Sequence, residues 1–397
     1  MKNSVKQHAS ALTAVLACLA LALVLYHSLA GGTLLQSSPY NSYALQAENW
    51  LAGRNNIANG ENYTWLELAI YQGRYYQSFP PVPAVLMLPF VAAAGEWSAI
   101  PGNLIAMGLA LLCAGGVYAC CMRGGMQPVT CAFFTLFVSM GSNVFWMSTS
   151  DGVWFLAQVC ALGFAFWGLF FAQGGNAVQD AAASLCMALA VGCRPFYALL
   201  LACWLGWQFY QRRSLKRILP ALLPAVVMAA CMMAYNFARF GSVTEFGHNY
   251  LPEFVRAENG QFSLTYLVPN LLQLLRPVTL DAQGQLHFEI YNGFLFFAAN
   301  PLFLLAMVRG LLLRLPGHQA EVQVSVPLPS AGWFVAAMCL LMTCLTCMHR
   351  TLGGWQFGAR YMVDLFPWLF VWCALHAEYI KQTMPLQPGM DIQAEMG

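Results

Sequence analysis

Three carboxylates and two arginines lie among aromatic residues in one polar stretch near the N-terminus. The carboxylates are Glu48, Glu61 and Glu67, and the arginines are Arg54 and Arg74. A carboxylate can accept a proton from an attacking hydroxyl, and an arginine can hold a phosphate group. The stretch therefore suits a group-transfer site. The alternative is that Tyr and Trp gather at any membrane interface and that surface acids are only solvated.

Two of these acids are candidates for a catalytic base. Glu67 lies within Trp-Leu-Glu-Leu-Ala, whose apolar side chains would raise the pKa of a half-buried carboxylate and favour its use as a base. Glu48 lies nearer the first apolar segment, where an acid would meet a lipid-borne phosphate, whereas Glu61 has the Asn and Gly neighbours of a turn. Arg74 is a candidate for phosphate contact, and Tyr75 for contact with sugar or lipid.

A second polar stretch, residues 241–289, carries Glu245 and His248 after a turn punctuated by glycines. Three residues apart, the two side chains could meet on a helical turn and take part in binding a substrate or a divalent metal. Two ligands fall short of a complete metal site, so a structural turn is the alternative. His248 could also carry a proton near neutral pH.

A third stretch, residues 349–360, ends in Gly-Gly-Trp-Gln-Phe-Gly-Ala-Arg360. Glycines let backbone amides approach an anion, and Arg360 could supply the charge that holds a phosphate. Asp364 follows four residues later, so an ion pair between Arg360 and Asp364 is the alternative.

Arg194, followed by Pro195, interrupts an apolar segment, where a charge is costly and normally faces a cavity or a partner. The pair could mark a substrate pathway, or a break between two short helices that would change the orientation of the chain beyond it. Asp151 falls on the inner side when helices are counted. An error in that count would move it, so no role is assigned to Asp151.

The elements that position these residues are predicted to be membrane-spanning helices. The 397 residues are 59% hydrophobic and 9% charged, against roughly 45–50% and 25% in a soluble domain. With a net charge of +2, the chain lacks the excess of basic residues that binding a polyanion requires. Nucleic-acid binding is therefore excluded. Apolar windows of about 20 residues predict an all-α integral membrane fold of about ten spans, in one polytopic domain over residues 1–380. The predicted spans are 9–30, 82–96, 103–121, 128–147, 152–172, 181–209, 218–239, 290–313, 332–348 and 361–380.

Basic residues orient these spans, because cytoplasmic flanks collect Lys and Arg. The densest cluster is Arg212, Arg213, Lys216 and Arg217. Counting spans from this cluster puts both termini in the cytoplasm, including a short tail at 381–397, and leaves Arg123 as an exception in an outer turn.

The same count places residues 31–81, 241–289 and 349–360 on one outer face, where we expect the chemistry. Within the first of these loops, Tyr43–Leu51 and Tyr63–Ile70 mix apolar and polar residues at helical spacing. Both are predicted to be short helices at the membrane interface.

This layout resembles the polytopic GT-C glycosyltransferases, the superfamily of protein mannosyltransferases and aminoarabinose transferases, and in particular its bacterial mannosyltransferase-like members. The resemblance rests on the first outer loop and on four short motifs. These are Gly73-Arg-Tyr-Tyr, Phe79-Pro-Pro, Arg194-Pro195 and the Gly-Trp-Gln-Phe-Gly-Ala-Arg360-Tyr before the last span. The resemblance implies transfer of a sugar from a polyprenyl-phosphate donor, with inversion and a first-loop acid as base. The acceptor would be an envelope glycan, lipid or protein on the outer face of the bacterial plasma membrane.

The sequence departs from the family at Asn41-Ser-Tyr43, where many relatives carry the catalytic acid just after the first span. An amide cannot be a base. The resemblance therefore implies that Glu48 or Glu67 takes the role, or that the chain binds lipid-linked sugar without transferring it. The rival hypothesis, drawn from Arg194, is a transporter or flippase of a lipid-linked or small solute.

Overall fold

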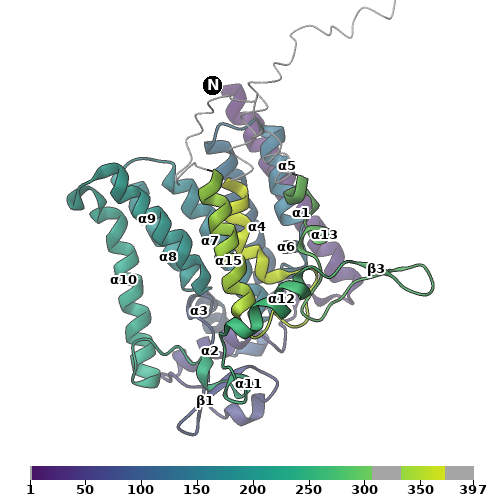
Figure 1. Cartoon of the computed structure of the whole chain (residues 1–397), viewed down its shortest axis with the longest axis vertical. Helices are drawn as coiled ribbons and strands as arrows, with labels where there is room; N and C mark the ends of the chain where they lie inside the picture. Colours follow the sequence, from purple (N-terminus) through teal and green to yellow (C-terminus); the bar gives the residue numbers. More distant parts are fainter. Residues whose placement is uncertain (1, 306–331, 372–397) are drawn as a thin grey trace, which may run out of the picture.

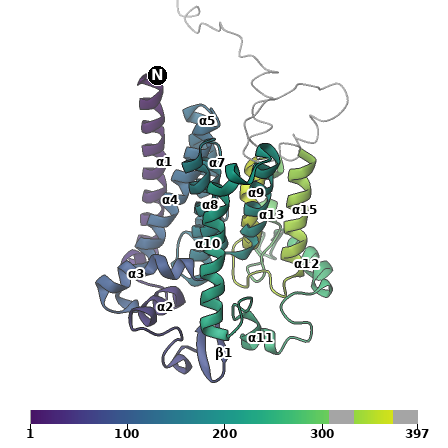
Figure 2. The ribbon, with the colours of Figure 1, turned by 90° about the vertical axis from the view of Figure 1, so that its left-hand side faces the viewer.

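The computed structural model describes residues 2–305 and 332–371, which form a bundle of helices with a layer of loops at one end (Figures 1 and 2). We call this end the loop face. Among the described residues, four helices are long and apolar enough to span a membrane. They are α1 (Lys2–Leu29), α4 (Gly102–Arg123), α7 (Val153–Ala172) and α10 (Leu215–Phe240).

Shorter helices complete the bundle and the loop layer. In the bundle they are α5 (Pro128–Ser139), α6 (Val144–Met147), α8 (Ala177–Val191), α9 (Ala198–Arg212), α13 (Phe296–Ala299) and α15 (Gly332–Met348). In the loop layer they are α2 (Ser42–Leu51), α3 (Val82–Ala94), α11 (Pro252–Val255) and α12 (Leu267–Leu274). The strands form two antiparallel hairpins, β1 (Leu68–Tyr71) with β2 (Arg74–Gln77), and β3 (Thr279–Leu280) with β4 (Leu286–His287).

Helix α7 is the centre of the bundle. It packs between α4 and α8. Of its most apolar 18-residue segment, 72% is buried, against 17% for the corresponding segment of α1 and 11% for that of α10. Small residues allow the close approach. A Cβ added to Gly163 would already lie 3.3 Å from the Cβ of Cys113 on α4. The first turn of α7 therefore has a fixed position at the loop face.

Helix α3 does not cross the bundle, so the predicted span at 82–96 is wrong. Asn103, at the start of α4, donates from its side chain to the Thr33 carbonyl (2.9 Å) and from its backbone to the Gln36 carbonyl (3.0 Å). Because α1 ends just before Thr33, residues 30–101 begin and end at the loop face. The 13-residue α3 lies there beside α2 (Figure 2).

The predicted span 181–209 consists of two antiparallel helices, α8 and α9. Arg194, which precedes Pro195, is extended (φ −147°, ψ 117°), because a proline disfavours helical geometry in the residue before it. The chain then turns back, and Arg212 at the end of α9 forms an ion pair with Asp180 near the start of α8 (2.5 Å). Of the two interpretations of this proline, the helix break is correct.

These two errors compensate each other further along the chain. Losing one span and splitting another leaves residues 241–289 and 349–360 at the same end as the first loop. Tyr71 of β1 donates to the Phe240 carbonyl at the end of α10 (3.3 Å), and Phe262 pairs with His349 in a β-bridge. Because α3 does not cross the bundle, Arg123 lies at the same end as Arg212, and not in an outer turn.

The first loop is part helix and part hairpin. Helix α2 confirms the prediction for Tyr43–Leu51, and the Asn41 side chain caps it by accepting the backbone N–H of Ala44 (2.9 Å). The helix predicted at Tyr63–Ile70 is wrong. The chain forms β1 and turns through Gln72 (φ 48°) and Gly73 (φ 72°), the pair of left-handed residues that a two-residue hairpin turn requires.

The C-terminal part is described only to residue 371. A 3₁₀ helix, Arg360–Leu365, follows the third polar stretch. The predicted spans 290–313 and 361–380 lie partly outside the described residues, and the tail 381–397 lies wholly outside them.

Candidate functional site

A cavity of about 200 Å³ opens at the loop face where five segments meet. These segments are the end of the first loop, the start of α7, the break between α8 and α9, and the second and third polar stretches. Its polar and aromatic lining includes Phe79, Trp154, Arg194, His248, His349 and Arg360. The cavity thus joins Phe79 to Tyr361, which lie 282 positions apart in the sequence.

Arg194 forms a bidentate ion pair with Asp364 on one side of the cavity. Arg194 Nε lies 3.0 and 2.9 Å from the two Asp364 oxygens, and Nη2 lies 2.7 Å from Oδ2. The Asp364 side chain is 1% exposed and that of Arg194 is 13% exposed. The partner of Asp364 is therefore Arg194, and the sequence-based alternative of an Arg360–Asp364 pair is wrong.

Arg360 is buried and is held by neutral groups. Its Nη1 donates to Gln158 Oε1 (2.9 Å), while Nε and Nη2 donate to the Gly353 carbonyl (3.1 and 2.6 Å). Within the described residues, no carboxylate lies within ion-pair distance of Arg360. The guanidinium groups of Arg194 and Arg360 both stack on the Tyr361 ring, 4.9 and 4.8 Å from its centroid. The cavity wall therefore carries two cations, of which only Arg194 is paired with a carboxylate, and this arrangement suits an anionic ligand.

Glu67 reaches the cavity through Trp154. The indole Nε1 of Trp154 donates to Glu67 Oε2 (3.0 Å), which ties the first loop to the first turn of α7. Surrounding protein raises the pKa of Glu67 above its usual 4.5, while the Trp154 hydrogen bond and the charge of Arg360 act in the opposite direction. The direction of the pKa shift agrees with the expectation from the apolar neighbours of Glu67 in the sequence.

Glu48 lies elsewhere in the first loop, where its carboxylate accepts the backbone N–H of Trp97 (2.7 Å). It caps the short 3₁₀ helix Trp97–Ala99 and is not among the residues that line the cavity. Arg74 is exposed beside the hairpin turn, and Tyr75 packs against Gly60 and pairs with Ile57. The structure does not bring these three side chains to the cavity.

Glu245 and His248 bind different partners. Glu245 accepts hydrogen bonds from the Gly247 N–H (2.7 Å) and the Asn249 side chain (2.8 Å). His248 lines the cavity, and its Nδ1 lies 3.0 Å from the Ser78 carbonyl. In the part of the chain that the structure describes, no three His, Cys, Asp or Glu side chains are grouped so that they could hold a metal ion.

Asp151 lies at the loop face and not at the opposite end, because α3 does not cross the bundle. Its carboxylate accepts hydrogen bonds from the Ser37 hydroxyl (2.6 Å), the Ser38 N–H (2.7 Å) and the Asn41 side chain (2.7 Å). Burial raises the pKa of Asp151, and these donors act against that rise. Asn41, the residue at which the family resemblance leads one to expect an acid, is thus a donor to a neighbouring acid.

Sequence reasoning missed Trp154, Gln158 and the location of Asp151. Trp154 and Gln158 are four residues apart on α7 and so lie on one face of that helix. A glutamine inside a long apolar helix was the available signal, because a polar side chain in such a helix normally has a specific partner.

No family model matches the chain, and no curated protein matches its sequence. Solved structures do match its fold. The apo oligosaccharyltransferase of Archaeoglobus fulgidus has a TM-score of 0.53 and 11% identity, over 94% of this chain and 51% of that one. The structure of ArnT from Cupriavidus metallidurans bound to undecaprenyl phosphate has a TM-score of 0.51 and 14% identity, over 92% of this chain and 60% of that one.

Both structures are GT-C glycosyltransferases, and this chain shares their membrane fold across nearly its whole length. The resemblance that the loops and motifs indicate is therefore confirmed at the level of the fold. The chain spans about half to three-fifths of the length of these two proteins.

Proposed function

We propose that this chain is a membrane glycosyltransferase that moves a sugar from a polyprenyl-phosphate donor to an envelope glycan, lipid or protein acceptor. The observation that carries the proposal is one cavity at the loop face that is lined by Arg194, Arg360 and Trp154, with the Glu67 carboxylate hydrogen-bonded to Trp154. A base, a site for an anion and a hydrophobic wall are what transfer from a phosphate leaving group needs. The undecaprenyl phosphate bound by the similarly folded ArnT supports a donor of this class.

In this reaction the Glu67 carboxylate takes the proton of the acceptor hydroxyl as its oxygen bonds to the anomeric carbon. The bond from that carbon to the phosphate oxygen breaks, and the phosphate leaves with the electron pair. Arg360 faces the leaving group, since its charge is not cancelled by a carboxylate among the described residues. Arg194, already neutralised by Asp364, positions Tyr361 beside it.

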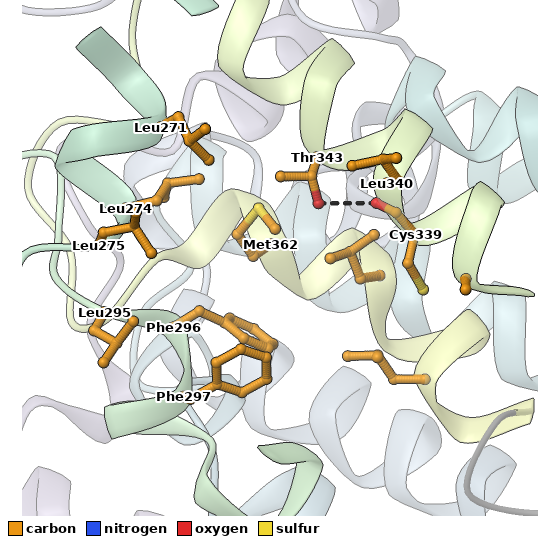
Figure 3. A pocket seen from close by; sticks show the side chains of 13 residues that line it. Leu271, Leu274, Leu275, Leu295, Phe296, Phe297, Cys339, Leu340, Thr343 and Met362 are labelled. Carbon is orange, nitrogen blue, oxygen red and sulfur yellow. Dashed lines mark hydrogen bonds between the residues drawn. The ribbon is translucent and has the colours of Figure 1, made fainter. Parts of the chain in front are cut away.

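The lipid chain of the donor has a place beside this site. An apolar pocket of about 360 Å³ lies between α12, α13, α15 and the 3₁₀ helix that begins at Arg360 (Figure 3). Met362 and Leu365 of that 3₁₀ helix line it, so one short element borders both the polar cavity and the apolar pocket. The Thr343 hydroxyl in the pocket wall donates to the Cys339 carbonyl (2.8 Å). Because this hydroxyl is already hydrogen-bonded, the pocket surface stays apolar.

The membrane location follows from the same proposal. The loop face would be the outer face of a bacterial plasma membrane, and the opposite end, with Arg123, Arg212, Arg213 and Lys216, would be cytoplasmic together with both termini. The transporter hypothesis rested on a charge in the middle of a span. Arg194 instead lies at a helix break and is paired with Asp364, so that observation does not require a transport pathway.

The proposal is tested with the purified protein in lipid vesicles. Labelled sugar is offered on a panel of polyprenyl-phosphate donors, with envelope lysate as the source of acceptor. We expect wild-type protein to release polyprenyl phosphate and label an acceptor. If the folded protein uses no donor in the panel, the proposed function is wrong.

A further inference from the structure

His248 has a rigid position at the cavity. Gly247 precedes it with φ +103°, a conformation that residues with a Cβ rarely adopt. The Glu245 carboxylate accepts hydrogen bonds from the Gly247 N–H and from the Asn249 side chain. These two hydrogen bonds stabilise the turn on both sides of His248. The imidazole packs against the rings of Phe79, Phe246 and Phe254, at centroid distances of 5.6, 5.0 and 6.0 Å.

The hydrogen bond to Ser78 decides the tautomer of His248. A carbonyl oxygen only accepts, so Nδ1 carries the hydrogen and Nε2 keeps its lone pair. Burial lowers the pKa of His248 to about 3, and the nearby His349, Arg194 and Arg239 contribute in the same direction. The ring is therefore neutral at physiological pH. Among the described residues, no protein group forms a hydrogen bond with Nε2.

Ser78 also connects His248 to Glu67. The Ser78 hydroxyl donates to the Glu67 carbonyl (3.2 Å), and the Ser78 carbonyl accepts from His248 (3.0 Å). One residue thus holds the backbone of the proposed base and the imidazole. The other histidine at the cavity, His349, is already engaged, because its Nε2 lies 3.2 Å from Gln261 and its Nδ1 lies 2.8 Å from the Thr351 carbonyl.

We infer that His248 Nε2 accepts a hydrogen bond from a hydroxyl of the donor sugar, which makes His248 a specificity-determining residue. The guanidinium groups of Arg194 and Arg360 present donors to the cavity, so an acceptor at Nε2 selects a different part of the ligand. With the phosphate at Arg360 and the attacking hydroxyl at Glu67, the sugar ring lies between them and presents its hydroxyls to the remaining wall. This inference rests on the proposed function for the identity of the ligand.

Two substitutions separate the nitrogens of this imidazole. His248→Asn keeps an N–H near the position of Nδ1 for the Ser78 carbonyl but has nothing at Nε2. His248→Gln can place an amide oxygen near Nε2. Donor binding, and not turnover, is measured in vesicles with a hexosyl polyprenyl phosphate and with its monodeoxy analogues.

We expect His248→Asn to weaken binding of the hydroxylated donor by about 10- to 100-fold, the range for a lost buried hydrogen bond. His248→Gln should recover most of this loss. One monodeoxy donor should bind wild type and His248→Asn equally, and the melting temperatures of both variants should stay close to wild type. Equal weakening for every deoxy donor, or no weakening for the hydroxylated one, would overturn the inference.

The binding assay also separates this inference from the proposed function. A protein that binds the hydroxylated donor through His248 but transfers no sugar supports the inference and contradicts glycosyl transfer. Transfer by wild type with no effect of His248→Asn on binding contradicts the inference alone. If no donor binds, both are wrong.

Discussion

The indole of Trp154 donates a hydrogen bond to Glu67, with 3.0 Å between Nε1 and Oε2. This contact joins the first loop to α7, the most buried of the four long apolar helices. It holds the carboxylate against Trp154, a residue of the cavity that Arg194 and Arg360 also line. Donor and acceptor come from segments 87 residues apart, so neither residue alone indicates the site.

Trp154→Phe should shift the pH profile of transfer. Glu67 must be ionised to act as a base, and desolvation by the surrounding protein raises its pKa, so kcat/KM should fall on the acid side at a pH above 4.5. The Trp154 N–H stabilises the ionised form. Its loss raises the pKa of Glu67 further and moves this acid limb to higher pH. A limb that stays in place or moves to lower pH would show that Glu67 is not the titrating base.

Asp364→Asn should strongly destabilise the protein, because it leaves the guanidinium of Arg194 buried without its carboxylate. Breaking such a pair costs about 3–5 kcal/mol, whereas removing both charges costs much less. The melting temperature in detergent should therefore drop for Asp364→Asn and partly recover in Asp364→Asn with Arg194→Met. Equal melting of the single and double variants would mean that the pair does not stabilise the fold.

Asn41→Asp should make stability depend on pH. The new carboxylate would lie where the Asn41 amide now contacts Asp151 at 2.7 Å, so the two acids must share a proton. Because the folded-state pKa of the pair is raised above that of the unfolded chain, the stability is present at low pH and is lost as pH rises through the folded pKa. Melting temperature measured from pH 4 to pH 8 should fall in Asn41→Asp relative to wild type. If the melting temperatures of the two proteins change with pH in the same way, the contact between residue 41 and Asp151 is contradicted.

Arg360→Ala should weaken donor binding more than Arg74→Ala, although the sequence makes both candidates for phosphate contact. Arg360 lines the cavity, whereas Arg74 is exposed beside the turn between β1 and β2. Loss of a charged hydrogen bond corresponds to about 10- to 100-fold in the dissociation constant. Arg256→Ala, an exposed arginine of the second stretch, is the control. Larger weakening in Arg74→Ala would place the phosphate at the hairpin instead.

The sequence predicted the face that carries the site better than it predicted the path of the chain. Apolar windows identify α1, α4, α7 and α10, because long apolar helices leave a clear signal. They cannot tell that the short α3 stays at the loop face, because that depends on tertiary packing. Pro195 is a local signal for the break within 181–209, but an apolar window does not register it, and tertiary packing decides that α9 turns back along α8. The polar stretches were predicted on one face because these two errors cancel.

The site itself was predicted in part. His248, Arg194 and Arg360 line the cavity and Glu67 is hydrogen-bonded to the lining residue Trp154, whereas Glu48, Arg74 and Tyr75 have local structural contacts elsewhere. Spacing along the chain also suggested that Asp364 pairs with Arg360. Three-dimensional packing instead brings Asp364 to Arg194, 170 residues away, and no local pattern carries that information.

The most direct test compares three carboxylates of the first loop in one transfer assay. Glu67→Gln, Glu48→Gln and Glu61→Gln are assayed with the wild-type protein for transfer of labelled sugar from a polyprenyl-phosphate donor. If Glu67 is the base, Glu67→Gln should lose at least about 100-fold in kcat, within the range for a lost general base, at an unchanged melting temperature. Glu61→Gln should stay near wild type, and so should Glu48→Gln, whose amide oxygen can still accept the Trp97 N–H. Wild-type turnover in Glu67→Gln, or loss of turnover in Glu48→Gln alone, would contradict the assignment.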